Sequence, residues 1–90
     1  MISNIHVIVS GQVQGVWFRA STKQKAQELG LTGWVRNTTN GCVEAVIEGE
    51  EEIVKKMIDW LHHGPPLAKV EDVKVKKQLA IGFNGFSVRY

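Results

Sequence analysis

Residues 5–19 read IHVIVSGQVQGVWFR, and this stretch constrains the fold and chemistry of the chain more than any other. It begins with β-branched residues from Ile5 to Val9, which predict a strand. Two glycines then allow a tight, concave turn in which neighbouring N–H groups can converge on one point. The stretch ends on Arg19, where a predicted helix starts and adds a partial positive charge. Together these features predict an anion cradle that suits a phosphoryl group.

The same loop lacks the side chains that many phosphoryl-transfer enzymes use. Residues 11–19 contain no Cys, His, Asp, Glu or Ser that could attack phosphorus and form a phosphoenzyme. No Gly-Lys-Ser/Thr follows the glycines, so the loop is not a Walker A loop. An enzyme built on this loop would therefore use water as its nucleophile.

Strand and helix patterns alternate along the rest of the chain. The Asn40-Gly41 pair predicts a hairpin turn, and Gly64-Pro65-Pro66 ends a clearly amphipathic helix. Val70 and Val73 differ in phase, which predicts a bulge in their strand. The predicted elements are strand Ile5–Val9, helix Arg19–Leu29, strands Thr32–Asn37 and Cys42–Glu48, helix Glu50–His62, and strands Val70–Lys77 and Phe83–Tyr90.

This order, βαββαβ with a further strand at the end, predicts an α+β, ferredoxin-like sandwich. We expect an antiparallel sheet of four to five strands. Right-handed crossovers would place both helices on one face of it. The 90 residues are expected to form one domain, residues 1–90, around a single core.

Composition narrows the classes of function. A net charge of +2 favours small anions but is too weak to indicate a nucleic-acid partner. No apolar run approaches the roughly 18 residues of a membrane span, and no signal-peptide pattern opens the chain. The single cysteine, Cys42, is compatible with a reducing cytoplasm. These features predict a cytoplasmic protein that binds neither membrane nor nucleic acid. We also expect the protein to be a monomer.

A second candidate site lies at Asn37, where a predicted strand ends. Its carboxamide offers two donors and one acceptor oxygen, so it could accept from a water and donate to a phosphoryl oxygen. In a ferredoxin-like topology this strand can lie near the glycine-rich loop. Sequence alone leaves open whether Asn37 is instead a turn residue bonded to its own backbone.

The two motifs together resemble those of the acylphosphatases. Residues 11–19 are similar to the first signature of that family, and the run from Gly33 through Asn37 and Gly41 to Gly49 is similar to the second. The resemblance covers essentially the whole chain. It implies a hydrolase that converts acyl phosphates to a carboxylate and inorganic phosphate, without a metal or cofactor.

The resemblance also implies roles for individual residues. Arg19 would bind the phosphoryl group, and Asn37 would position the attacking water. A carboxylate leaves readily, so positioning and charge stabilisation would supply most of the catalysis. With no protein base in the motifs, the phosphoryl group itself would take the proton of the water. The residues expected to form the phosphate cradle are Gln14, Gly15, Val16, Trp17, Phe18 and Arg19.

Three positions carry smaller expectations. Trp17 is bulkier than the residue often found there in the family, and its ring could narrow the pocket mouth or favour aromatic acyl groups. Cys42 stands where some relatives carry a hydroxyl residue. The family-like ending at Tyr90 suggests a terminal carboxylate near Arg19 that would orient the guanidinium.

Other functions are weaker alternatives for this sequence. An RNA recognition motif shares the element order but needs exposed aromatic residues on its central strands, and the strands at 5–9 and 43–47 supply none. A metal carrier of this shape would show paired cysteines in its first loop. Adjacent His62 and His63 point in different directions on a helix and are expected to stabilise its end. An anion-binding module without turnover stays open.

Overall fold

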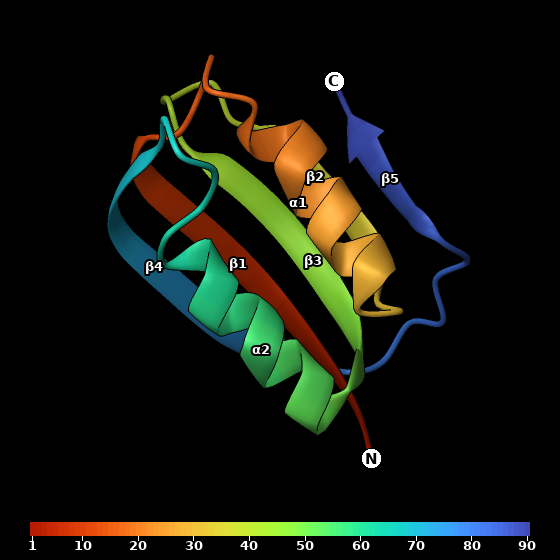
Figure 1. Ribbon diagram of the computed structural model, residues 1–90. Helices are drawn as coiled ribbons and strands as arrows, with labels where there is room; N and C mark the ends of the chain where they lie inside the picture. Colours follow the sequence, from red (N-terminus) through yellow and green to blue (C-terminus); the bar gives the residue numbers. More distant parts are fainter.

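The computed structural model describes residues 1–90 and arranges them in two layers, a five-stranded sheet and two helices on one of its faces (Figure 1). The strand order across the sheet is β4-β1-β3-β2-β5. The expected α+β, ferredoxin-like arrangement with both helices on one face is confirmed. The elements are β1 (Ile2–Gln12), α1 (Phe18–Glu28), β2 (Thr32–Asn37), β3 (Val43–Glu50), α2 (Glu51–Leu61), β4 (Lys69–Gln78) and β5 (Phe86–Arg89).

The sheet is mixed, which corrects the expectation of an antiparallel sheet. Strands β4, β1, β3 and β2 pair antiparallel, but β5 pairs parallel to β2, with Gly33 opposite Phe86 and Arg36 opposite Arg89. The reason is topological, because β4 ends at the end of the sheet where β2 begins. A chain that crosses there to the far edge must re-enter the sheet in the direction of β2. The carboxyl ends of β1, β2 and β5 therefore lie together (Figure 1).

Strand β1 is longer than its apolar pattern indicates, because it pairs with β3 on one side and β4 on the other. The bulge predicted near Val70 is confirmed in β4, opposite the carboxyl end of β1. The register shifts between Ser10, opposite Asp72, and Gly11, opposite Val70, so Glu71 is the extra residue. A Cβ on Gly11 would lie 2.2 Å from the carbonyl oxygen of Lys69, and its φ is 120°. Glycine is therefore required where the bulge brings these two backbones together.

The core lies between the sheet and the helices. Strand β1 turns Ile5, Val7 and Val9 toward the helices, and alternate residues of β3 join them. Helix α2 buries an apolar stripe, and α1 also buries three side chains: Phe18, Thr22 and Ala26. Neither helix has the length and apolar character that crossing a bilayer requires.

The connection between β4 and β5 crosses the end of the sheet and is held by a buried acid. The carboxylate of Glu48 is 6% exposed and accepts hydrogen bonds from the backbone N–H groups of Ile81 and Gly82 at 2.6 and 2.9 Å. It also accepts one from Asn4 Nδ2 at 3.0 Å. Because side chains alternate along a strand, Glu48 points away from the helices, and the crossover covers it there. Strand β5 starts at Phe86 rather than at the expected Phe83.

Candidate active site

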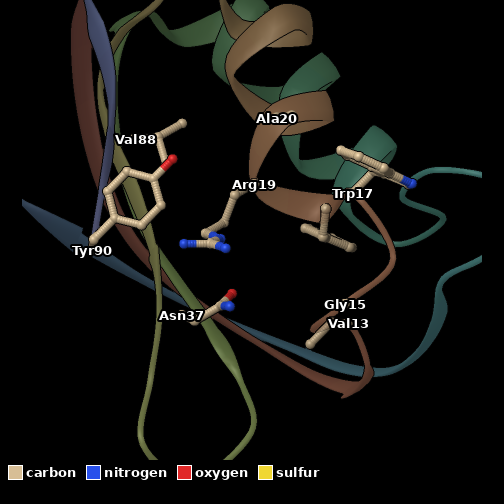
Figure 2. Close-up of a pocket in the computed structure, with 9 residues that line it drawn as sticks. Val13, Gly15, Trp17, Arg19, Ala20, Asn37, Val88 and Tyr90 are labelled. Carbon is tan, nitrogen blue, oxygen red and sulfur yellow. The ribbon is translucent and has the colours of Figure 1, made fainter.

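A pocket of about 300 Å³ lies at the end of the sheet where β1, β2 and β5 finish, beside the first turn of α1. The pocket brings Arg19 and Asn37, 18 positions apart in the sequence, to a common space (Figure 2). Its lining residues are Val13, Gly15, Trp17, Phe18, Arg19, Ala20, Asn37, Val88 and Tyr90. The expected proximity of the β2 end to the glycine-rich loop is therefore confirmed.

The loop between β1 and α1 has the backbone geometry of an anion-binding nest. Gly15 has a φ of 74° and Trp17 a φ of 67°, whereas the residues on either side of each have negative φ. This alternation turns successive N–H groups toward one point. No backbone hydrogen bond of the loops and turns uses an N–H group of residues 14–17 as donor. These donors are thus free for an anion at the positive end of α1.

Two of the residues expected in the cradle do not line the pocket. The side chain of Gln14 instead reaches the β2–β3 turn, where Nε2 donates to the carbonyl oxygens of Thr38 and Cys42, both at 2.8 Å. Val16 packs against the hydrophobic core. Both residues remain in the loop that carries the free N–H groups. Gln14 in addition joins that loop to the strand end bearing Asn37.

Arg19 carries the positive charge of the site. It is half-buried in the first turn of α1, and none of the ion pairs of the structure involves it. Its guanidinium carbon lies 4.9 Å from the centre of the Tyr90 ring, a cation–π contact. The expectation that a terminal carboxylate orients Arg19 is wrong, because no carboxylate forms an ion pair with this guanidinium. The aromatic face of Tyr90 takes that place, because parallel β5 delivers its ring to the pocket.

Asn37 is the most unusual polar residue of the site. Its Oδ1 atom is buried and has no hydrogen-bond partner, the only side-chain nitrogen or oxygen atom of the chain in that state. An unpaired buried acceptor costs about 1–3 kcal/mol, and such atoms call for an explanation. Figure 2 shows the carboxamide of Asn37 directed toward Arg19. The interpretation of Asn37 as a turn residue bonded to its own backbone does not fit this arrangement.

Negative charge is absent from the start of α1. The first turn of α1 carries no acidic residue, so the helix terminus and Arg19 act together on whatever enters the pocket. The His, Cys, Asp and Glu side chains form no group of three or more that could hold a metal ion. The polar and cationic groups of the pocket are those that suit a phosphoryl oxygen.

Comparison with known proteins identifies the family. The family model described as acylphosphatase matches residues 5–88. The chain belongs to the acylphosphatase family. An acylphosphatase of Trichormus variabilis is 54% identical over 85 residues, which cover 94% of this chain and 84% of that protein. An acylphosphatase of Pelotomaculum thermopropionicum is 50% identical over 86 residues, which cover 94% of each chain.

Solved structures of acylphosphatases have the same architecture. A structure of an acylphosphatase from Coxiella burnetii matches with a TM-score of 0.95 at 45% identity and covers 98% of this chain and 93% of that one. One from Bacillus subtilis matches with a TM-score of 0.94 at 35% identity over the full length of both chains. The fold expected from the acylphosphatase motifs is thus shared by members of the family.

The motifs did not indicate the apolar walls of the acylphosphatase pocket. Ala20 and Val88 line it but lie outside the motifs, and Val13 and Tyr90 stand in family-like segments that predicted no wall of the pocket. Two signals were present in the sequence. Ala20 directly follows Arg19 on the helix, and Val88 and Tyr90 alternate along the last strand. Their relation to the pocket depends on the parallel direction of β5.

Proposed function

We propose that this pocket hydrolyses acyl phosphates by direct attack of a water held by Asn37 on a phosphoryl group held by Arg19. The chain is an acylphosphatase, and it cleaves the carboxyl-phosphate anhydride bond to give a carboxylate and inorganic phosphate. The observation that carries the mechanism is the buried, unpartnered Oδ1 of Asn37 beside the only cation of the pocket. Such an acceptor suits the O–H of a nucleophilic water.

The proposed step needs only the substrate and water. A lone pair of the water forms the new P–O bond, while the bond between phosphorus and the acyl oxygen breaks and its electrons leave with the carboxylate. The proton of the water passes to a non-bridging phosphoryl oxygen. Asn37 orients the water through Oδ1. Arg19 and the free N–H groups of the loop stabilise the charge on the phosphoryl oxygens.

The predicted cradle residues have distinct parts in this proposal. The N–H groups of Gln14 to Phe18 would contact the phosphoryl oxygens, with Arg19 adding a planar, permanently charged donor fork. Preorganised donors of this kind are each worth about 10²- to 10³-fold in rate. No ionisable side chain of the protein changes its protonation state in the step.

We also propose that one domain, residues 1–90, acts as a monomer in the cytoplasm. Every group of the proposed site comes from one chain, which supports activity without a second copy. A single cysteine is compatible with a reducing compartment. Size-exclusion chromatography with light scattering tests this proposal. At the protein concentration used for kinetics, it should give the mass of one chain, 10.0 kDa.

The experiment that tests the mechanism measures benzoyl phosphate hydrolysis, with a chelator present, by the wild type, Arg19→Ala and Asn37→Ala. Both variants should lose about 100-fold or more in kcat/KM, as one preorganised donor or water ligand is removed. Arg19→Ala should also raise the inhibition constant of inorganic phosphate. Asn37→Ala should mainly lower kcat, because it removes an interaction with the water rather than with the phosphate.

Arg36→Ala is the matched control. Arg36 precedes Asn37 on β2 but is exposed and pairs with Glu44, with Nε and Oε1 2.5 Å apart. Its loss should leave the kinetics unchanged. A wild type that binds phosphate but does not hydrolyse benzoyl phosphate would refute the proposed hydrolysis. An Asn37→Ala variant with wild-type kcat would refute the role of Asn37.

A further inference from the structure

Trp17 has a backbone conformation that its side chain disfavours. It is the only non-glycine residue with positive φ, at φ 67° and ψ 20°, and it directly precedes the first helical residue of α1. Bulky L-residues rarely occupy the left-handed region, and those that do concentrate at functional sites. Glycine would have this conformation without strain. A bulky indole at this position therefore calls for a reason.

Packing of the protein core does not supply that reason. Trp17 is 75% exposed and is not part of the hydrophobic cluster under the helices. The other two tryptophans do have packing roles, since the ring of Trp60 packs at a tilt against that of Phe18 and Trp34 lies against two arginines. The indole of Trp17 has no comparable partner within the chain. It contributes strain and exposed apolar surface to the folded state.

The place of Trp17 is one wall of the active-site pocket. Figure 2 shows the indole on one side of Arg19, and Val88 and Tyr90 on the other. Six of the nine lining residues are hydrophobic, more than a phosphoryl group needs. The pocket holds about 300 Å³, and an apolar cavity of about 150 Å³ accommodates a benzene ring. The space beside the cradle therefore fits a ring-sized apolar group in addition to the phosphate.

We propose that Trp17 is a specificity-determining residue that packs against the acyl group, and that the pocket prefers aromatic acyl phosphates over small aliphatic ones. The inference rests on the proposed function, since it assumes that the phosphoryl group occupies the cradle. The acyl group then lies between the indole and the wall formed by Val88 and Tyr90. The substrate, rather than the core, covers the exposed indole.

The test compares benzoyl phosphate with acetyl phosphate in the wild type, Trp17→Gly and Trp17→Phe. Glycine retains the left-handed backbone and hence the cradle, whereas phenylalanine retains an aromatic wall. Trp17→Gly should lower the ratio of kcat/KM for benzoyl phosphate to kcat/KM for acetyl phosphate by about 10-fold, the lower end of what apolar pocket contacts discriminate. Trp17→Phe should retain most of the preference. The melting temperature of Trp17→Gly should be unchanged or higher.

A general disturbance of the cradle would lower kcat/KM for both substrates alike, so the ratio of the two values does not depend on it. The matched control is Trp34→Leu, on the opposite face of the sheet. A second measurement needs no turnover. Benzylphosphonate should inhibit the wild type more strongly than methylphosphonate, and Trp17→Gly should remove that difference. A wild type that hydrolyses neither substrate refutes the proposed function. If the wild type and Trp17→Gly hydrolyse both substrates with the same ratio of kcat/KM values, only the inference about Trp17 is refuted.

Discussion

Two carboxamide side chains at the same end of the sheet behave in opposite ways. Gln14 uses both of its N–H donors on the carbonyl oxygens of Thr38 and Cys42. Asn37, one residue before that turn, leaves its Oδ1 buried and unpaired. A fully bonded amide gives rigidity, whereas an unpaired one retains the capacity to bind a water. Gln14 thus fixes the glycine-rich loop against the β2–β3 turn, next to Asn37.

We expect Gln14→Ala to lower both activity and stability. The variant loses two hydrogen bonds, each worth about 0.5–1.5 kcal/mol, so it should destabilise the fold by about 1–3 kcal/mol. A shift of the loop against β2 should lower kcat/KM for benzoyl phosphate by about 10-fold or more, since small misplacements are costly in positioning catalysis. Gln14→Glu, which cannot donate, is the isosteric comparison and should be at least as impaired. Wild-type kinetics in Gln14→Ala would contradict the positioning role.

At the scale of elements, the parallel strand β5 delivers the second wall of the pocket. Its Phe86 is 5% exposed and belongs to the core, whereas Ser87 is exposed. The backbone N–H of Gly33 also donates to the carbonyl of Gly85 at 3.0 Å, which fixes where β5 begins. Phe86 is thus the one fully buried side chain of this short edge strand, and we expect it to contribute most to the docking of β5 beside the backbone bonds.

Phe86→Ala should accordingly lower the free energy of unfolding by about 3–5 kcal/mol, the usual range for a buried phenylalanine. Chemical denaturation measures this value. Hydrogen exchange should show β5 opening before the rest of the sheet. Ser87→Ala is the neighbouring control and should change stability by no more than about 0.5 kcal/mol. A Phe86→Ala variant as stable as Ser87→Ala would show that β5 docks by other means.

At the scale of the whole molecule, Glu48 ties the crossover to the sheet and makes the fold sensitive to acid. The hydrogen bond from Asn4 and the one from the N–H of Ile81 outweigh burial and hold the pKa of Glu48 below its usual value of 4.5. The unfolded chain therefore takes up the proton first as the pH falls. This contribution to stability is complete above about pH 4.5 and is lost as the pH falls through the folded-state pKa.

Glu48→Gln should therefore be less stable than the wild type by about 1–3 kcal/mol at pH 7, because the NH2 half of its amide would face N–H donors from which it cannot accept a hydrogen bond. The difference should shrink below pH 4.5, where the wild type loses its own carboxylate. Melting temperatures from pH 3 to 7 measure both effects. Glu52→Gln, exposed at the start of α2, is the control with an unchanged profile. A constant difference at every pH would argue against the ionised carboxylate as the cause.

Much of this molecule could be predicted because its signals are local. The patterns that predicted its elements span only a few residues each: the alternation along β1 and β3, the Asn40-Gly41 turn and the stripe of α2. The structure contains each of these elements. The bulge near Val70 was predicted for the same reason. The motifs also marked Arg19 and Asn37, which the fold brings into one pocket. Their catalytic roles remain predictions.

The sequence by itself therefore determined the order of the elements, the single helical face and the two motifs of the site. Only the tertiary structure decided the direction of β5, the burial of Glu48 and the contact of Arg19 with the Tyr90 ring. It also decided that Asn37 is left unpaired and that Trp17 adopts a left-handed backbone. The physical reason is that these features depend on groups far apart in the chain, whose meeting is set by crossovers and packing rather than by local propensity.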